Sequence, residues 1–254
     1  MSDDDSATPV PERYRGVWVR SLLTTPSSRD DTTFVRWLQT SRWHADLRVP
    51  PEARPARLAL QQGFCGVTTV EVSDAGELCR WHRRLDFQPP GPHPDAGHID
   101  FDGPERLVET GVHADYLEVW ERLPGSTGRF AVLEATQGPA PTMLLVSGEF
   151  AMRVRPRRAA WPSDTTAADT LHDLVQRHPA AAPALLDFEI SFGRLLFGRL
   201  HIAQSTLPTL EGTDAACRIE RVANDTAVMH GPAAATRWRV LEWHSEGSES
   251  LLLA

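Results

Sequence analysis

The residues best suited to chemistry lie in one short segment, residues 80–88. With the period of two that a β-strand imposes, the side chains of this segment fall on two unlike faces. One face presents the polar set Arg80, His82, Arg84, Asp86 and Gln88, and the other presents Trp81, Arg83, Leu85 and Phe87. Acid, base and hydrogen-bonding groups beside large aromatic rings are typical of the wall of a small-molecule cavity.

A second strand-like run, residues 113–122, carries a similar mixture. One of its faces presents Tyr116, Glu118 and Trp120. On adjacent strands of a barrel the two polar faces can share one lumen, where a carboxylate desolvated beside aromatic rings has a raised pKa and can transfer protons near neutral pH. The candidate catalytic residues are therefore His82, Asp86, Tyr116 and Glu118. The alternative is that His82 and Asp86 are structural polar groups tied to Arg84 or to the backbone.

The candidate ligand contacts combine aromatic rings with hydrogen-bonding side chains, and they are Trp18, Arg20, Arg84, Gln88 and Trp120. A guanidinium group matches the two oxygens of a carboxylate, and Arg84 is the arginine that we expect to anchor a ligand. We expect Arg20 to stack beside Trp18 and close one barrel end. Arg48 is expected to pair with Asp46 and fix a loop.

The composition excludes several classes of function. All 26 basic residues are arginine, so a Schiff-base lysine, a phosphate-binding Walker lysine and a lysine general base are excluded. The formal net charge of −8 offers no basic patch for nucleic acid. The first 11 residues are acidic and contain proline instead of an apolar run, and no apolar stretch reaches membrane-spanning length. We predict a cytoplasmic protein that binds neither nucleic acid nor membrane.

The cysteines and histidines show no metal-binding spacing. The three cysteines lack a CxxC pattern and are odd in number, which disfavours disulfides and a thiolate zinc site. His93, His98 and His113 flank a Gly/Pro-rich loop without an HxH or HxxxH pattern, so no metal site is predicted. No cofactor is predicted either, with a haem held by one histidine inside a barrel as the alternative.

Short alternating segments separated by Gly, Pro, Asp and Ser recur along the whole chain, which is typical of an all-β protein. The segment Pro124–Gly128 resembles a linker and divides these segments into two sets. Up-and-down meanders hide their edges by closing into barrels. We therefore predict two antiparallel barrels in tandem, at residues 14–124 and 129–254, after a flexible tail at residues 1–13. Helices are expected at residues 164–178, capped by Asp164 or Thr165, and at residues 54–62.

Several local patterns resemble the calycin superfamily, the lipocalins and fatty-acid-binding proteins. Gly16-Val17-Trp18 matches its Gly-x-Trp signature. The wider set of patterns is Val35-x-Trp37-Leu38-Gln39, Ala45-Asp46-Leu47-Arg48-x-Pro50, Trp81-His82-Arg83, Tyr116-x-Glu118-x-Trp120, Glu189-Ile190-Ser191-Phe192-Gly193-Arg194 and Ser205-Thr206-Leu207-Pro208. In this order they resemble a family of tandem lipocalin-like barrels from fungi and bacteria, whose yeast member interacts with a casein-kinase-I-type protein. The resemblance covers nearly all of the chain after Tyr14 and implies the double-barrel fold, with little about mechanism.

Two hypotheses of different class follow. In the first, the chain is a cofactor-independent lyase, isomerase or cyclase that binds a small, partly apolar organic molecule in the first barrel, as a monomer or a homodimer. In the second, it is a non-catalytic ligand-binding or protein-interaction barrel, whose polar residues only hold the barrel closed. A filled lumen around Glu118 favours the second hypothesis, and a solvent-reaching pocket with unpaired polar groups favours the first.

Overall fold

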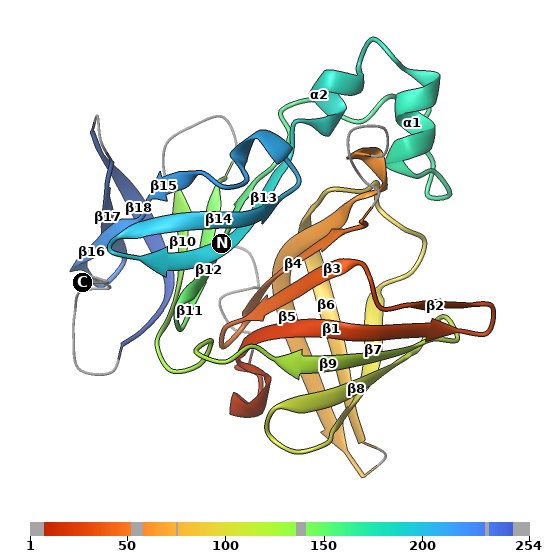
Figure 1. Cartoon of the computed structure of the whole chain (residues 1–254), viewed down its shortest axis with the longest axis horizontal. Helices are drawn as coiled ribbons and strands as arrows, with labels where there is room; N and C mark the ends of the chain where they lie inside the picture. The colour runs from red at the N-terminus through yellow and green to blue at the C-terminus, as the bar shows by residue number, and fades with distance from the viewer. Residues whose placement is uncertain (1–7, 52–57, 75, 136–140, 232–233, 246–254) are drawn as a thin grey trace.

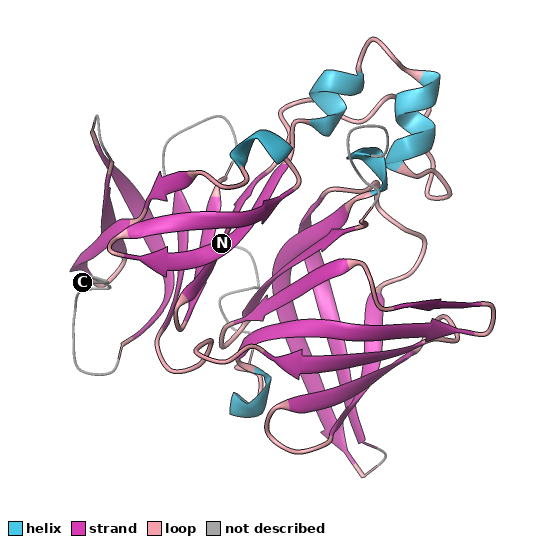
Figure 2. Cartoon of the chain, viewed as in Figure 1, coloured by secondary structure: helices cyan, strands magenta, loops and turns pink. Residues whose placement is uncertain are grey.

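The computed structural model of the chain describes residues 8–51, 58–74, 76–135, 141–231 and 234–245. About 54% of the chain is strand and 9% is helix, which confirms the predicted all-β class (Figure 2). Two antiparallel sheets of nine strands each account for the strand content.

The first sheet contains β1 (Gly16–Thr25), β2 (Ser28–Asp30), β3 (Phe34–Gln39), β4 (Trp43–Val49), β5 (Gln62–Ser73), β6 (Gly76–Asp86), β7 (Asp95–Phe101), β8 (Arg106–Gly111) and β9 (Leu117–Arg122). The second contains β10 (Phe130–Ala135), β11 (Met143–Ser147), β12 (Phe150–Arg155), β13 (Glu189–Leu196), β14 (Arg199–Ser205), β15 (Asp214–Ala216), β16 (Arg218–Ala223), β17 (Thr226–His230) and β18 (Ala235–His244). The helices are α1 (Leu171–Arg177) and α2 (Ala182–Leu186).

The first sheet closes on itself as an up-and-down barrel (Figure 1). Each strand pairs with the next along the chain, and β1 also pairs with β9, while β2 only extends the end of β1 as a short hairpin. The closure leaves eight strands around one lumen, a number at which the interior is just wide enough to be filled by side chains or to hold one small ligand.

The second sheet is a curled half-barrel, which differs from the closed second barrel expected from the sequence. Its strand order is β15-β14-β13-β12-β11-β10-β18-β17-β16, so β15 and β16 are its two edges. These two strands are consecutive in the chain and are separated only by Cys217. A one-residue connection carries the chain from one edge into the other without the turn that two paired antiparallel strands need.

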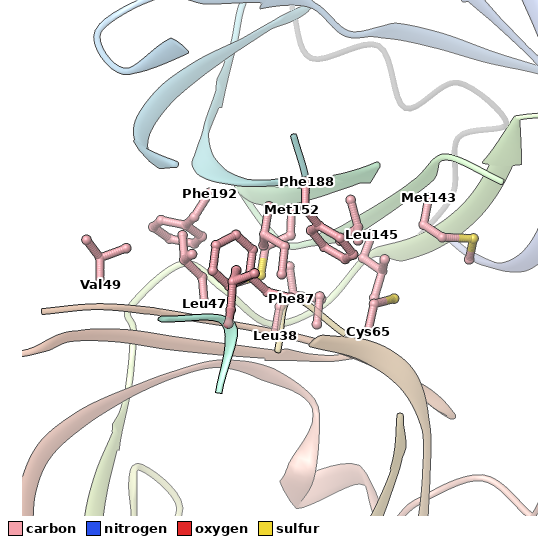
Figure 3. Packing of buried hydrophobic residues seen from close by; sticks show 14 of the residues in the cluster. Leu38, Leu47, Val49, Cys65, Phe87, Met143, Leu145, Met152, Phe188 and Phe192 are labelled. Atoms are coloured by element: carbon pink, nitrogen blue, oxygen red, sulfur yellow. The ribbon is translucent and has the colours of Figure 1, made fainter. Parts of the chain in front are cut away.

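One hydrophobic core joins the two sheets. The alternate residues Ala45, Leu47 and Val49 of β4 point out of the first barrel and meet Ile190 and Phe192 of β13. Figure 3 shows Leu38, Leu47, Phe87 and Cys65 from the first barrel facing Leu145, Met152, Phe188 and Phe192 from the second sheet. The first barrel is therefore apolar on both faces of β3 and β5, with one core inside the lumen and a second against its neighbour, while β4 is apolar on its outer face.

The connecting segments are packed at defined places. In the expected linker, Ser126 is buried, its Oγ accepts a hydrogen bond from the Val17 backbone at 2.9 Å, and its carbonyl accepts one from Ser147. Within the expected tail, Val10 is buried in the core of the first barrel, below its closed end.

Thr170 caps α1 in a capping box with Asp173, so the helix begins later than the sequence suggested. The second expected helix, at residues 54–62, lies partly outside the described residues, and Leu58–Leu60 form a single 3-10 turn. No helix in the described part of the chain is long and apolar enough to cross a membrane.

Candidate functional site

The lumen of the first barrel is filled by aromatic rings. Trp37 lies at its centre, with ring centroids 6.3 Å from Trp18, 5.4 Å from Trp81 and 5.8 Å from Trp120. Between them a void of about 10 Å³ remains, which also borders Phe64. A void of this size is about that of one water molecule, so the lumen has no room for an organic ligand in this conformation.

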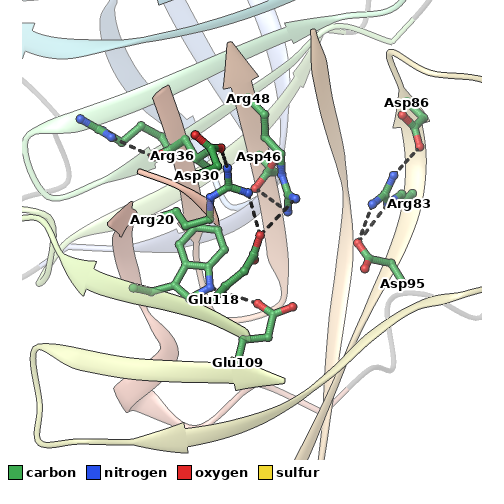
Figure 4. Close-up of polar contacts among 12 residues, drawn as sticks. Arg20, Asp30, Arg36, Asp46, Arg48, Arg83, Asp86, Asp95, Glu109 and Glu118 are labelled. Atoms are coloured by element: carbon green, nitrogen blue, oxygen red, sulfur yellow. Dashed lines mark hydrogen bonds and ion pairs between the residues drawn. The ribbon is translucent and has the colours of Figure 1, made fainter. Parts of the chain in front are cut away.

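A chain of ion pairs crosses the lumen above the tryptophans (Figure 4). Arg20 donates to Glu118 and to Asp30, each at 2.7 Å, and Arg48 donates to Asp46 at 2.8 Å and lies 3.7 Å from Glu118. The Arg20 and Glu118 side chains are only 6% and 4% exposed. Glu118, a catalytic candidate, is thus held by two arginines, and the expected pair of Arg48 with Asp46 is present on β4.

Glu109 on β8 is a buried acid that the sequence-based list of candidates lacks. Its Oε1 accepts a hydrogen bond from the Tyr116 hydroxyl at 2.7 Å and its Oε2 accepts one from Trp120 Nε1 at 3.2 Å. Burial, together with the negative charge of Glu118, raises the pKa of Glu109 to about 8. Burial and Glu109 likewise raise the pKa of Tyr116. At neutral pH, Glu109 is therefore mainly protonated.

Two glycines on neighbouring strands make room for this pair. Gly97 of β7 and Gly111 of β8 lie opposite each other in the sheet. A Cβ on Gly97 would lie 2.8 Å from Glu109 Cγ, and one on Gly111 would lie 2.4 Å from the Tyr116 ring. The absence of both side chains lets Tyr116 fold over the wall of the barrel and reach Glu109.

A β-bulge in β6 places His82 and Asp86 on opposite faces of the barrel wall. The pairing of β5 with β6 shifts between Cys65 and Gly66, so Arg84 is an extra residue without a partner position on β5. An inserted residue reverses the alternation of inward and outward side chains on its far side. The nine-residue segment therefore does not have the single polar face that a regular strand would give it.

His82 lies on the outer face, where it is exposed and its Nε2 is 2.9 Å from Thr69 Oγ1. Asp86 lies after the bulge, is half-buried, and accepts a hydrogen bond from Arg83 Nη1 at 3.1 Å. Burial raises the pKa of Asp86, against the opposing effect of Arg83. The expectation that all four catalytic candidates share one lumen is therefore wrong for His82, while Glu118 lies in the lumen and Tyr116 reaches Glu109 there.

Arg122, and not Arg20, closes the barrel over Trp18. The two residues are directly paired between β1 and β9, and the Arg122 guanidinium carbon lies 4.6 Å from the Trp18 ring centroid. Arg122 also donates to the backbone carbonyl of Arg15 at 2.5 Å. The expected stack of Arg20 on Trp18 is wrong because Arg20 turns into the lumen toward Glu118.

The other two ligand candidates lie outside the lumen. Arg84 is exposed, with its guanidinium carbon 4.4 Å from the Trp43 ring centroid. Gln88 donates to the carbonyl of Gln61 at 2.6 Å and accepts from the Leu171 backbone at 2.8 Å, so it ties the loop after β6 to α1. Both residues line an open cleft.

This cleft, of about 810 Å³, lies between the first barrel and the segments that follow β12 and precede β13. The first barrel contributes Trp81, Leu85 and the proline-rich loop 88–95, and the second half of the chain contributes Trp161 and Phe188. Ligand pockets commonly enclose about 300–1,000 Å³ and are lined by apolar and aromatic groups with a few polar ones. The cleft matches this description, whereas the lumen does not.

Arg83 separates the cleft from the lumen. It lies 3.7 Å above the Phe64 ring and bridges Asp86, at 3.1 Å, to Asp95, at 2.7 Å (Figure 4). Trp81 and Asp95 line both the cleft and the small lumen void. The two spaces therefore share a wall that one ion-paired arginine covers.

No group of three or more His, Cys, Asp or Glu side chains that could hold a metal ion occurs within the ranges that the structure describes. The three cysteines are buried and free.

Comparison with known proteins identifies the architecture and no activity. No protein-family model matches the chain, and no curated protein matches it. The chain is similar in structure to the uncharacterized protein YLR301w from Saccharomyces cerevisiae, with a TM-score of 0.58 and 13% sequence identity over 91% of this chain and 99% of the yeast chain. At this identity the likeness shows the fold alone, and one closed barrel beside one half-barrel fits a tandem calycin-like arrangement.

Proposed function

We propose that the protein binds a small, partly apolar and planar organic molecule in the cleft between its first barrel and the segments that flank β12 and β13. The observation that supports this proposal is the cleft itself, an open space of about 810 Å³ walled by Trp81, Trp161 and Phe188. Aromatic rings on facing walls suit a flat ligand because offset or edge-on ring contacts add to the gain from apolar burial.

We do not place the ligand inside the first barrel, because its lumen is filled by side chains. Glu118 and Arg20 satisfy each other there, and the tryptophans leave a void of only about 10 Å³. Polar groups that hold a barrel closed explain this interior without a ligand. Binding without catalysis is therefore the function that the geometry supports best.

The proposal can be tested by filling the cleft from one wall. Gly91 lines the cleft and a Cβ there would meet nothing within 4 Å, so Gly91→Trp can project into the space while Gly91→Ala is the matched control. We expect small aromatic compounds that bind the wild type, detected by calorimetry, to bind Gly91→Ala equally and Gly91→Trp at least tenfold more weakly. Equal binding to both variants would place the ligand elsewhere.

Native mass spectrometry of the freshly purified protein gives an independent test. A retained small molecule that Gly91→Trp loses would support the cleft as the binding site. Retention of a protein in place of a small molecule would favour a protein-interaction barrel instead.

We propose acid–base catalysis in the lumen as a second function, of the cofactor-independent lyase, isomerase or cyclase type. The observation that favours it is Glu109, a buried acid with a pKa of about 8 that accepts a hydrogen bond from Tyr116 and lies near Glu118. A proton donor that is protonated at neutral pH is suited to general acid catalysis. The substrate would have to reach the lumen from the cleft, past Arg83, and displace side chains there, because the present void is only about 10 Å³.

This second function requires turnover that depends on Glu109. A metabolite extract incubated with the wild type, with Glu109→Gln and with Glu121→Gln as an exposed control on β9 can be compared by mass spectrometry. We expect a compound consumed by the wild type and by Glu121→Gln to persist with Glu109→Gln. A compound consumed equally by all three proteins would exclude Glu109 as the acid.

A further inference from the structure

Arg157 is a residue of the cleft that ties the second half of the chain to the first barrel. It lies just after β12, in the segment that leads toward α1, and lines the cleft. Its Nε donates to the carbonyl of Leu185 at 2.8 Å, Nη1 donates to the carbonyl of Asp86 at 3.3 Å, and Nη2 donates to the carbonyl of Phe87. Each terminal nitrogen carries two N–H groups, so one N–H on Nη1 and one on Nη2 have no acceptor among the described residues.

The charge of Arg157 has no carboxylate partner among the residues that the structure describes. Within the described ranges no Asp or Glu oxygen forms an ion pair with it, whereas Arg83 on the same cleft has two such partners, Asp86 and Asp95. Burial without a paired carboxylate lowers the pKa of Arg157 to about 10, with Asp86 opposing the shift from further away. A half-buried cation with only neutral acceptors is stabilised by an anion that reaches it.

Aromatic rings hold this guanidinium in place. Its carbon lies 3.9 Å from the Trp161 ring centroid and 5.1 Å from that of Phe188. Stacking and the three carbonyl contacts fix the plane of the group before a ligand arrives, which reduces the entropy lost on binding. The same two rings belong to the aromatic wall of the cleft.

From these contacts we infer that the ligand of the cleft is an aromatic or otherwise planar carboxylate, whose two oxygens accept the two remaining N–H groups of Arg157 while its apolar part packs on Trp161. This inference rests on the proposed binding function and names the chemical class of the ligand. A carboxylate suits the site because its two oxygens match the spacing of paired guanidinium N–H groups.

Three probes with one indole ring and different charge can test the class. Indole-3-acetate is an anion, indole-3-acetamide is its neutral isostere, and tryptamine is a cation of similar size. We expect calorimetry on the full chain to give the acetate about tenfold to a hundredfold tighter binding than the amide, as one charge-assisted pair contributes, with no detectable binding of tryptamine. We also expect rising salt to weaken binding of the acetate and to leave binding of the amide unchanged.

Substitution of Arg157 shows whether this residue contacts the ligand or has a purely structural role. Arg157→Gln should remove the preference for the acetate over the amide, while Arg158→Gln, a change at the exposed neighbouring arginine, should keep it. Because Arg157→Gln also loosens a tie between the sheets and can reduce folding, the salt dependence of the wild type provides the test that needs no variant.

The possible outcomes distinguish this inference from the function on which it rests. Equal affinity of acetate and amide for the wild type would overturn the carboxylate class and leave binding in the cleft intact. Tighter binding of tryptamine than of the acetate would do the same. Failure of all three probes to bind at millimolar concentration would overturn both the inference and the proposed function for a ligand of this size.

Discussion

Replacement of Glu118 by glutamine tests whether the ion pairs of the lumen hold the barrel together. The change keeps the shape of the side chain and removes the charge that faces Arg20 at 2.7 Å and Arg48 at 3.7 Å. Breaking a buried ion pair by removing one partner typically costs about 3–5 kcal/mol, because the other charge is left uncompensated. Arg20 keeps Asp30 and Arg48 keeps Asp46, so we expect a loss near the lower end, about 3 kcal/mol.

For a chain of this length, about 1 kcal/mol corresponds to about 2–4 °C in melting temperature. Glu118→Gln should therefore melt roughly 6–12 °C below the wild type. Urea denaturation followed by tryptophan fluorescence gives the free energy of unfolding. The matched control is Glu121→Gln, an exposed carboxylate on the same strand, for which we expect a change within about 0.5 kcal/mol. A Glu118→Gln protein as stable as the wild type would refute the argument, because it would mean that desolvation of Glu118 cancels its pairing with the arginines.

Three further predictions concern other parts of the first barrel. Between pH 4.5 and about 8, Glu109 holds a proton in the folded state that it loses on unfolding, so the free energy of unfolding should fall as the pH rises, by up to about 1.4 kcal/mol per pH unit. Urea midpoints should fall less steeply with pH in Glu109→Gln than in the wild type, and an equal dependence on pH would contradict the raised pKa of Glu109. Arg122→Met should lower the free energy of unfolding by about 1–3 kcal/mol, since the backbone carbonyls to which Arg122 donates lose this partner at the barrel end next to Trp18. A melting temperature equal to that of the wild type would show that Arg122 does not stabilise the barrel. Gly111→Ala should destabilise the protein and displace Tyr116, because its Cβ would lie 2.2 Å from a backbone carbonyl oxygen, while Gly91→Ala should leave the stability nearly unchanged. Coinciding melting curves of the two variants would contradict this prediction.

The sequence was sufficient to predict the fold class, because alternation and turn residues report directly on short strands. It was not sufficient to predict the closure of each sheet. The one-residue connection at Cys217, which leaves the second sheet open, has no distinct composition. Likewise, the sequence of residues 142–155 indicates one long strand, whereas the structure has a hairpin of β11 and β12 that turns at Gly148 with a positive φ of 56°.

The site was predicted only in part for a related reason. Glu118 was placed correctly on the inner face because β9 alternates regularly, whereas Tyr116 precedes β9 and reaches the interior where Gly111 leaves room for its ring. His82 was misplaced because the bulge at Arg84 depends on the pairing with β5, which a single strand does not encode. The sequence around Glu109 gave no signal of a functional site, because it shows only an acid next to the apolar Val108. Arg157 gave none, because its proposed role as a ligand contact depends on loops that meet only in the folded chain.

The core shared by the two sheets also constrains how the chain emerges from the ribosome. The first barrel can close once Arg122 has been synthesised, since β9 then becomes available to β1. Its outer apolar surface at Leu47 and Cys65 is covered only in part, by residues such as Leu145 and Met152, until Phe192 on β13 arrives. At about 5–20 residues per second, the ~70 intervening residues take roughly 4–14 s. During this interval the nascent chain carries a closed barrel with an exposed apolar surface. We expect this surface to bind chaperones, and we expect the first half of the chain to aggregate when it is expressed alone.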